Sequence, residues 1–192
     1  MSSQIRAFVR FLMAKAFQGE SYEIKPVWID RALAATLADA RYSVRERGDE
    51  NIIAEIVANG NSLPVFFYRL GREIREAEGA DSPTLPVVHG LMREVCSCEI
   101  YFSNVIGVGL QVIHGLGTVI GSRNTIGRGF RIYQGSTVGH RTVGEGGATI
   151  GNDVILYANA SILGPITIGD GVIVRAQTIV TADVDSPEKS SS

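Results

Sequence analysis

The second half of the sequence carries an apolar residue at every sixth position, and this period limits the fold more than any other feature. From Ile120 to Val180, ten of eleven positions in the frame hold Ile, Val or Leu, and only Gly144 breaks the series. A period of six matches neither an α-helix nor a single strand. It predicts a parallel β-solenoid in which each hexad forms one flat face and three faces close a triangular coil of about 18 residues.

Two further expectations follow from that coil. Side chains 18 positions apart should stack, which places Ile120 on Val138, Leu156 and Val174, and Ile132 on Ile150 and Ile168. Glycine follows the frame residue at Ile106-Gly107, Ile126-Gly127, Val138-Gly139, Ile150-Gly151 and Ile168-Gly169. Because a residue without Cβ is favoured where the chain turns sharply, we expect corners at these pairs.

The frame fails at two places, and such departures from local consistency tend to mark functional sites. Upstream, the anchor after Val112 is Ile120, eight residues on, so two extra residues enter the coil where His114 lies. Downstream, Gly144 lies within the polar, glycine-rich stretch GHRTVGEGGAT. We expect this stretch to leave the coil as a loop that carries His140.

Up to about residue 98 the apolar residues recur at helical spacing instead, most clearly at Ile29, Leu33, Leu37, Ala40 and Val44. Pro26, Pro64 and Pro86 precede apolar runs, as first-turn prolines do, and Gly48 and Gly79 fall where helices are expected to stop. Four or five helices are predicted, with Phe8, Leu12, Phe66, Leu70, Leu91 and Val95 in their core. The fold class is therefore α+β: an α-helical domain over 1–98, a β-helix over 99–184 and a disordered tail over 185–192.

Composition excludes several functions. The formal charge of -2 gives no electrostatic attraction to nucleic acid or anionic lipid. No apolar run reaches the roughly 18 residues of a membrane span. Arg10 and Lys15 interrupt the apolar residues of the first segment, which predicts an amphipathic helix of a cytoplasmic protein. Cys96 and Cys98 are too close in sequence for an easy disulfide, so we expect reduced, partly buried thiols.

The stretch from Glu99 to Val180, which includes EIYFSNVIGVGLQVIHGLG and TIGNDVILYANASILG, resembles the serine acetyltransferases among the hexapeptide-repeat acyltransferases. The resemblance implies a left-handed parallel β-helix and an acetyl-CoA-dependent O-acetyltransferase without a metal. It also implies a small acceptor, serine-like or a sugar. The implied assembly is a homotrimer or a dimer of trimers, in which the coils of neighbouring copies form the donor groove.

The resemblance also implies site residues. The family has an acidic residue and a histidine fifteen positions apart, and Glu99 and His114 fall at that spacing. His114 is then the general base, a role that suits a side chain with a pKa of about 6.5, and Glu99 orients it. The family's loop glycines correspond to Gly135 through Gly139, and its Gly-Ala-Gly-Ala groove corresponds to Tyr157, Ala158, Asn159 and Ala160.

Departures from the family pattern concern the acceptor. Ile113 replaces the aspartate that contacts the amino-acid acceptor, and the family's second histidine has no aligned counterpart, so His140 is the candidate stand-in for acceptor contact. Arg175 and Arg141 are candidates for the phosphates of coenzyme A. We interpret His89, in a predicted helix, as a packing residue.

Two other function classes stay open. A metal-dependent hydratase of the gamma carbonic anhydrase type would use three histidines on the same fold, and His114 and His140 superficially match two of them. The position of the third ligand holds Glu145. A catalytically idle β-helix that serves as an oligomeric scaffold is the other alternative, and thioester consumption separates it from an acetyltransferase.

Overall fold

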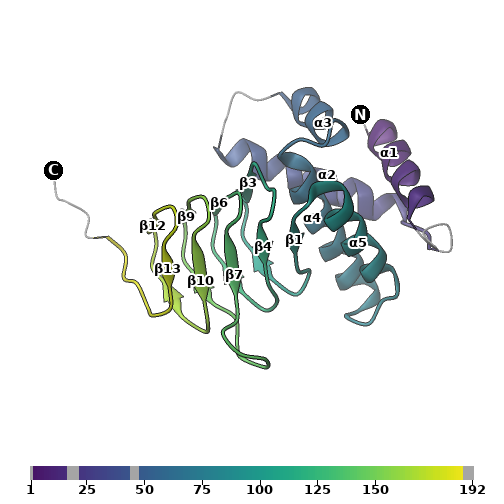
Figure 1. The fold of residues 1–192 in the computed structure, drawn as a ribbon. Helices are drawn as coiled ribbons and strands as arrows, with labels where there is room; N and C mark the ends of the chain where they lie inside the picture. Colours follow the sequence, from purple (N-terminus) through teal and green to yellow (C-terminus); the bar gives the residue numbers. More distant parts are fainter. Residues whose placement is uncertain (1, 17–21, 44–47, 188–192) are drawn as a thin grey trace.

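A computed structural model describes residues 2–16, 22–43 and 48–187. A group of helices covers one end of a β-solenoid, and the last described residues lie toward its opposite end (Figure 1). The helices are α1 (Ser2–Lys15), α2 (Pro26–Ser43), α3 (Asp49–Val57), α4 (Ser62–Glu78) and α5 (Thr84–Cys96). In the described part of the chain, no helix is both long and apolar enough to cross a membrane.

The helix boundaries mostly follow the expected signals. Pro26 opens α2, and Pro64 and Pro86 lie in the first turns of α4 and α5, where a missing backbone N–H costs nothing. Gly79 ends α4 with a φ of 91°, a conformation that favours glycine. Gly48 was expected to end a helix and instead precedes α3 as its N-cap.

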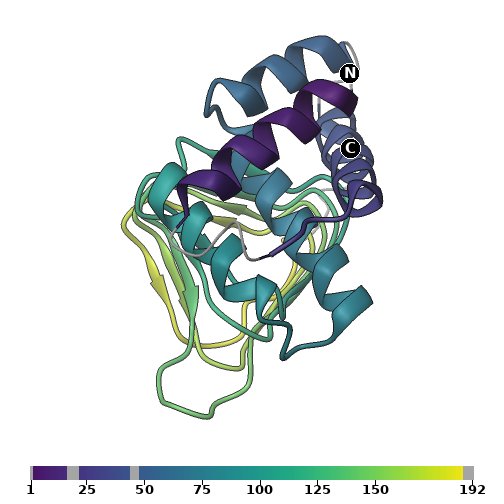
Figure 2. The same ribbon diagram turned by 90° about the vertical axis from the view of Figure 1, so that its right-hand side faces the viewer.

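The predicted helical core is largely in place. Leu12, Phe66, Leu70 and Leu91 are buried, together with Ile29, Leu33 and Leu37 on the inner face of α2, whereas Phe8, Ala40 and Val95 are partly buried. Val44 lies outside the described residues. The face that α2 buries packs mainly against α4, the central helix of the group (Figure 2).

The solenoid consists of short parallel strands. They are β1 (Glu99–Ile100), β2 (Val105–Ile106), β3 (Gln111–Ile113), β4 (Val119–Ile120), β5 (Thr125–Ile126), β6 (Arg131–Tyr133), β7 (Thr137–Gly139), β8 (Thr149–Ile150), β9 (Ile155–Leu156), β10 (Ser161–Leu163), β11 (Thr167–Ile168), β12 (Ile173–Val174) and β13 (Ile179–Val180). They form three sheets: sheet A is β1-β4-β7-β10-β13, sheet B is β2-β5-β8-β11, and sheet C is β3-β6-β9-β12. We number the coils one (β1–β3), two (β4–β6), three (β7–β9) and four (β10–β12).

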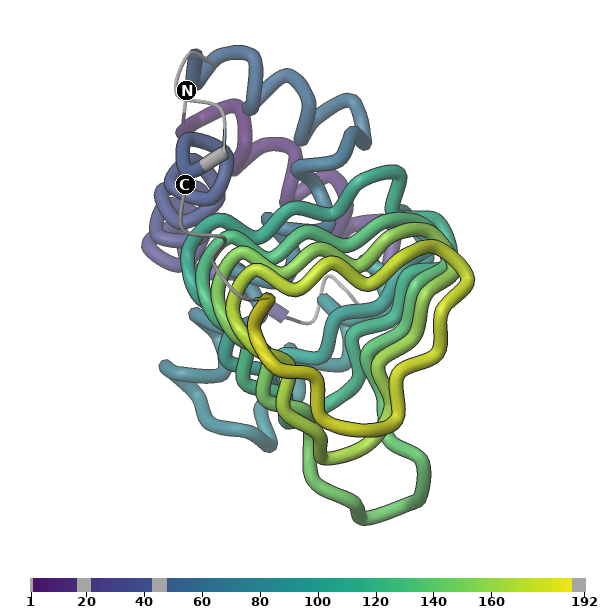
Figure 3. Tube along the Cα trace, turned by 90° about the vertical axis from the view of Figure 1, so that its left-hand side faces the viewer, coloured from purple at the N-terminus to yellow at the C-terminus, as the bar shows by residue number. Residues whose placement is uncertain are grey.

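Viewed along its axis, the solenoid is triangular (Figure 3). The six-residue frame supplies its interior, because frame residues from Ile100 to Val174 are buried and Val180 is partly buried. This confirms the predicted fold class of helices followed by a left-handed β-helix.

The predicted stacking holds within each side of the 140–148 loop, where Leu156 pairs with Val174 and Ile150 with Ile168, and is wrong across the loop. Ile120 pairs with Val138 as expected, but Val138 pairs with Ile162, and Leu156 pairs with Ile132. The cause is the 140–148 loop, which leaves the coil after β7 and projects from the triangle (Figure 3). Residues paired across that loop are 24 positions apart instead of 18, so every later residue moves to another sheet.

The glycines that follow frame residues are explained by close approach between coils. A Cβ on Gly107 would lie 2.8 Å from the backbone of Gly127, and one on Gly127 would lie 2.7 Å from that of Gly151. Positive φ occurs at other glycines, such as Gly109 and Gly129. At these glycines successive coils approach backbone to backbone, whereas the atoms nearest a Cβ on Gly139 belong to the side chains of Thr137 and Leu163.

A buried ion pair joins the helices to coil one. Arg69 on α4 donates two hydrogen bonds to Asp39 on α2, at 2.7 and 2.8 Å, and further bonds to the carbonyl oxygens of Ile106 and Gly107. Asp39 also accepts the backbone N–H of Gly109 at 2.7 Å. Only 2% of the Asp39 side chain is exposed, so this network is a fixed part of the junction.

A second contact runs along the solenoid from the end of α2. The ring of Tyr42 lies over the backbone at Gly109 and Gly129, and its hydroxyl donates a hydrogen bond of 2.9 Å to Asp153 in coil three. The helical group therefore contacts more than the first coil.

Candidate active site

One edge of the solenoid, where sheet C turns into sheet A, collects most of the predicted site residues. We call it the His114 edge, and it comprises residues 113–117, 133–135, 157–159 and 175–177. Backbone hydrogen bonds of 2.9–3.0 Å join Gly135 to Leu116, Asn159 to Gln134 and Gln177 to Ala158. This edge therefore carries His114 followed by candidate donor-binding residues, the last of which is Arg175. His114 and Arg175 are 61 positions apart in the sequence.

His114 lies at the head of this edge, at the turn that contains the two extra residues. It adopts a φ of 51°, uncommon for a residue with a Cβ, and it is exposed. Its backbone N–H donates a hydrogen bond of 3.1 Å to the side-chain oxygen of Asn61, which comes just before α4. The frame slip thus presents an exposed imidazole and ties its backbone to the helical group.

Glu99 lies on β1 of sheet A, next to the strand that follows the His114 turn, and its carboxylate lies near His89. The backbone places Glu99 beside the His114 turn, because Gly117 donates to Ser97 at 2.8 Å and Glu99 donates to Thr118 at 2.9 Å. The Glu99 carboxylate is 3.5 Å from Nε2 of His89 on α5.

His89 is partly buried against two rings of the β1–β2 turn. The ring centroids of Tyr101 and Phe102 lie 4.8 and 5.4 Å from its own. Burial lowers the pKa of His89 below its ordinary value, although the nearby Glu99 carboxylate opposes the shift. Sequence reasoning treated His89 as packing and missed that it faces Glu99.

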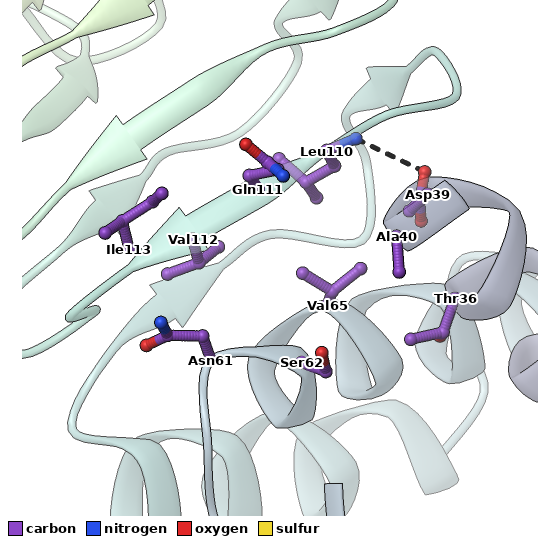
Figure 4. Close-up of a pocket in the computed structure, with 10 residues that line it drawn as sticks. All are labelled: Thr36, Asp39, Ala40, Asn61, Ser62, Val65, Leu110, Gln111, Val112 and Ile113. Atoms are coloured by element: carbon purple, nitrogen blue, oxygen red, sulfur yellow. Dashed lines mark hydrogen bonds between the residues drawn. The ribbon is translucent and has the colours of Figure 1, made fainter. Parts of the chain in front are cut away.

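A small cavity of about 90 Å³ opens between the helices and β3, beside Ile113 (Figure 4). Polar groups reach it from Asn61, Ser62 and Gln111, and Val65 and Ile113 supply apolar wall. Asp39 is the acidic residue among those that line it, and Arg69 and backbone N–H groups already neutralise its carboxylate. The cavity therefore offers hydrogen bonds and apolar contact, but no uncompensated negative charge.

Gly139 and His140 lie on a different edge, where sheet A leads into the 140–148 loop. His140 fastens that loop to coil two, because Nδ1 is 3.0 Å from the carbonyl oxygen of Gly146 and Nε2 is 3.0 Å from that of Ser122. Nε2 also lies 3.3 Å from the hydroxyl oxygen of Ser122. One chain thus places His114 and His140 at opposite borders of sheet A.

The 140–148 loop is also fastened internally by Glu145. Its carboxylate accepts hydrogen bonds from the backbone N–H groups of Arg141, at 2.8 Å, and Thr142, at 3.2 Å. The Arg141 N–H bond is the main cause that lowers the pKa of Glu145 below its usual range, so the carboxylate stays ionised at neutral pH. Arg141, a candidate for phosphate contact, pairs with this same carboxylate at 3.1 Å.

The two cysteines are part of the helical end of the chain, where α5 leads into β1. Cys96 and Cys98 are free and buried, as expected, and a hydrogen bond with Cys98 together with burial raises the pKa of Cys96. Among the described residues, no three His, Cys, Asp or Glu side chains come together as metal ligands within one chain.

Comparisons with known proteins agree with this geometry. Residues 147–182 match the family model described as bacterial transferase hexapeptide (six repeats). The serine acetyltransferase of Helicobacter pylori is 38% identical over 96 residues, which cover 49% of this chain and 56% of that enzyme. The serine acetyltransferase of Synechococcus elongatus is 36% identical over 107 residues, or 54% of this chain and 44% of that enzyme. The chain thus spans about half the length of the curated relatives it matches.

Solved structures extend the likeness into the helices. Soybean serine acetyltransferase in complex with serine aligns with a TM-score of 0.68 and 27% identity, over 82% of this chain and 64% of that one. The Neisseria gonorrhoeae enzyme aligns with a TM-score of 0.66 and 25% identity, over 82% and 59%. The resemblance predicted from the sequence is confirmed: the carboxyl-terminal half of this chain is a hexapeptide-repeat, left-handed β-helix similar to that of serine acetyltransferases.

Proposed function

We propose that this protein is an acetyl-CoA-dependent O-acetyltransferase in which His114 is the general base. The observation that carries the proposal is the His114 edge itself. An exposed histidine stands at the start of a line of donor-binding candidates, and a small cavity opens beside the preceding residue, Ile113. Serine acetyltransferase relatives with the same fold support the reaction class.

In the proposed reaction the acceptor hydroxyl attacks the thioester carbonyl directly. The imidazole of His114 takes the hydroxyl proton as the new C–O bond forms, and the C–S bond breaks as the tetrahedral intermediate collapses. The imidazolium then returns the proton to the departing thiolate, so His114 ends neutral. Glu99 stabilises the imidazolium, and the reaction requires no covalent enzyme intermediate.

The donor is proposed to bind along the His114 edge, against Gly135 and Ala158, with Arg175 near its phosphates. Gly139 and the loop beside it would contribute from the second edge. Because the two edges border opposite sides of sheet A, one chain does not bring them to a common point. A groove between the solenoids of two neighbouring copies would unite them, with the His114 edge of one copy facing the Gly139 edge of the next.

We therefore expect a homotrimer, or a pair of trimers joined through the helices. Closed cyclic assemblies repeat one interface around the axis, so each copy would supply half of every donor groove. Multi-angle light scattering at micromolar concentration checks this prediction. A monomer that retains full acetyl transfer would contradict the shared groove.

The acceptor is expected to lack a free ammonium group next to the reacting hydroxyl. An α-ammonium loses hydration on entering a cleft, and Ile113 offers no carboxylate to compensate. Asp39 in the same cavity is already neutralised by Arg69. Losing a charged hydrogen-bond partner costs about 1.5–3 kcal/mol, so free L-serine should be roughly ten- to a hundredfold poorer than a sugar or N-acylated amino alcohol.

A thiol-release assay with acetyl-CoA and a panel of acceptors measures this preference. The panel contains L-serine, homoserine, amino sugars and sugar nucleotides, and N-acetylserine is the matched partner of serine. If L-serine gave the highest kcat/KM, another group, such as His140 or Glu145, would have to hold the ammonium. Absence of thiol release with every acceptor would favour the scaffold alternative.

A further inference from the structure

His89 has no role in the reaction proposed above, yet its contacts hold the side chain in one orientation. It lies on α5, and 19% of its side chain is exposed. The rings of Tyr101 and Phe102 meet the imidazole edge-on, with angles of 63° and 69° between the planes. Phe102 is itself wedged against α4, where a Cβ on Gly71 would lie 2.3 Å from its ring. The imidazole is therefore fixed by packing against both rings.

The position of α5 relative to β1 is fixed as well. Met92, about one turn after His89, accepts a hydrogen bond of 3.3 Å at its sulfur atom from the backbone N–H of Ile100. Glu99 and Tyr101 flank Ile100, whose side chain is buried in the solenoid. Because side chains alternate along an extended chain, Glu99 and Tyr101 lie on the same outer side of the chain, and both contact His89. One short segment thus supplies the carboxylate that faces the imidazole and a ring that holds it.

The surroundings of Nε2 select one tautomer of His89. This nitrogen is buried, 3.5 Å from the Glu99 carboxylate, and none of the described groups forms a hydrogen bond with it. A lone pair on Nε2 would be repelled by the carboxylate oxygen, whereas an N–H there is attracted. A buried N–H without a partner is costly, and a shift of about half an ångström would give it a hydrogen bond of ordinary length. The site therefore favours the tautomer with a proton on Nε2.

The electrostatic surroundings keep His89 neutral. Burial lowers the pKa of His89, the Glu99 carboxylate opposes this shift, and the positive charge of Arg93 on α5 adds to it. The ring also lines a cavity of about 400 Å³, whose other titratable groups are Arg75, Asp81 and Tyr101. At neutral pH the imidazole can therefore donate a hydrogen bond to Glu99 without neutralising the carboxylate.

Glu99 also borders a hollow of about 310 Å³ that does not include His89. Its lining contains Gly117, Thr118 and Val119, the residues that follow the His114 turn. A carboxylate has two oxygen atoms and accepts several hydrogen bonds. Because Oε1 is the atom of Glu99 that lies nearest His89, Oε2 remains for a second partner.

We propose that His89 is a positioning residue for acetyl transfer: its Nε2–H holds one oxygen of Glu99, and the other oxygen stabilises the imidazolium of His114. The inference rests on the proposed function and adds a third group to it. His89 touches neither donor nor acceptor and exchanges no proton during the reaction. It restricts Glu99, a long side chain whose rotamer freedom would otherwise have to be lost when the imidazolium forms.

Steady-state kinetics of acetyl transfer with His89→Leu and His89→Gln tests this role. Leucine keeps apolar contact with the two rings and removes the donor, so kcat should fall about tenfold. The KM for the acceptor and the affinity for coenzyme A should not change. Glutamine keeps an N–H that can reach the same oxygen, so His89→Gln should recover most of the rate. Glu94→Gln, a change of charge at an exposed position of α5, is the control.

Three further readouts separate positioning from packing. In the Glu99→Gln background, His89→Leu should have no further effect on kcat, because His89 acts only through the carboxylate. The acidic limb of the pH profile of kcat/KM should move to lower pH in His89→Leu, as in Glu99→Gln, since a less stabilised imidazolium forms only in more acidic solution. Nitrogen-15 NMR of the wild-type protein should show the proton of neutral His89 on Nε2.

Each contrary outcome has one meaning. If the wild-type protein transfers acetyl groups and His89→Leu keeps the full rate, His89 is a packing residue and the proposed function stands. The same conclusion follows if the losses from His89→Leu and Glu99→Gln multiply in the double variant. A proton on Nδ1 of neutral His89 in the wild-type protein overturns the positioning role even where His89→Leu does not fold. If the wild-type protein releases no thiol from acetyl-CoA with any acceptor, the proposed function fails and the positioning role fails with it.

Discussion

Replacing His114 by alanine is expected to lower kcat/KM for acetyl transfer by about 10²–10⁴-fold, the usual contribution of a general base. Coenzyme A affinity should stay close to the wild-type value, because the donor contacts proposed here lie further along the same edge. Steady-state kinetics with acetyl-CoA, together with calorimetric titration of coenzyme A, separates the two effects. A variant that keeps more than about a tenth of the wild-type rate would show that another group takes the proton.

Glu99→Gln is the companion variant, and its effect should be smaller. The amide keeps the size of the side chain and loses the charge that is proposed to stabilise the imidazolium of His114. The Glu99 carboxylate faces His89 at 3.5 Å in the structure, so His89→Leu shows whether that contact matters. If Glu99→Gln were as damaging as His114→Ala, the carboxylate would have to do more than orient the base.

Asp39→Ala is expected to have the largest effect on stability, lowering the free energy of unfolding by about 3–5 kcal/mol. The substitution leaves Arg69, whose side chain is only 14% exposed, without its charged partner. It also removes the acceptor for the N–H groups of Gly109 and Leu110. For a chain of this length the loss corresponds to a fall in Tm of roughly 10–15 °C, which differential scanning calorimetry measures directly.

Asp30→Ala is the matched control, because Asp30 lies on the same helix and also pairs with an arginine. Its partner is Arg6, and both side chains are more than a third exposed, so solvent screens the pair and its loss should lower the free energy of unfolding much less than Asp39→Ala does. Equal losses from the two variants would mean that the ion pair at the junction does not fix the helices to the solenoid.

The solenoid could be predicted from the sequence because its six-residue repeat can be recognised within short stretches of the chain. A buried residue every six positions requires no knowledge of distant contacts, and the frame slip at His114 was visible as a change in spacing. The predicted stacking across the 140–148 loop, such as Leu156 on Val138, failed for the same reason. A fixed spacing of 18 residues per coil counts the 140–148 loop as part of the coil, although the loop residues leave it.

The surroundings of the site could not be predicted, because they depend on contacts between the two halves of the chain. The side chain of Asn61 accepts a hydrogen bond from the backbone N–H of His114, 53 positions away, and no sequence motif near either residue predicts this bond. His89 has the helical spacing of a packing residue, and only the docking of α5 on β1 shows that it faces Glu99. Tyr133 and Tyr157 stack on adjacent coils, but a fixed spacing of 18 residues does not bring them together, because they are 24 positions apart.

The helices cover one end of the solenoid, and Tyr42 contacts the solenoid only as far as coil three. The two ends of the solenoid are therefore supported unequally. In a stack where each coil is held mainly by its neighbours, fraying begins at the end with fewer neighbours. His114 lies at the end of coil one, which the helices cover, whereas Arg175 follows coil four, beyond the reach of Tyr42. Under the proposed function, acetyl transfer would take place at the end that the helices hold, and the charged end of the donor would bind toward the other end, so a bound donor would connect coils one to four.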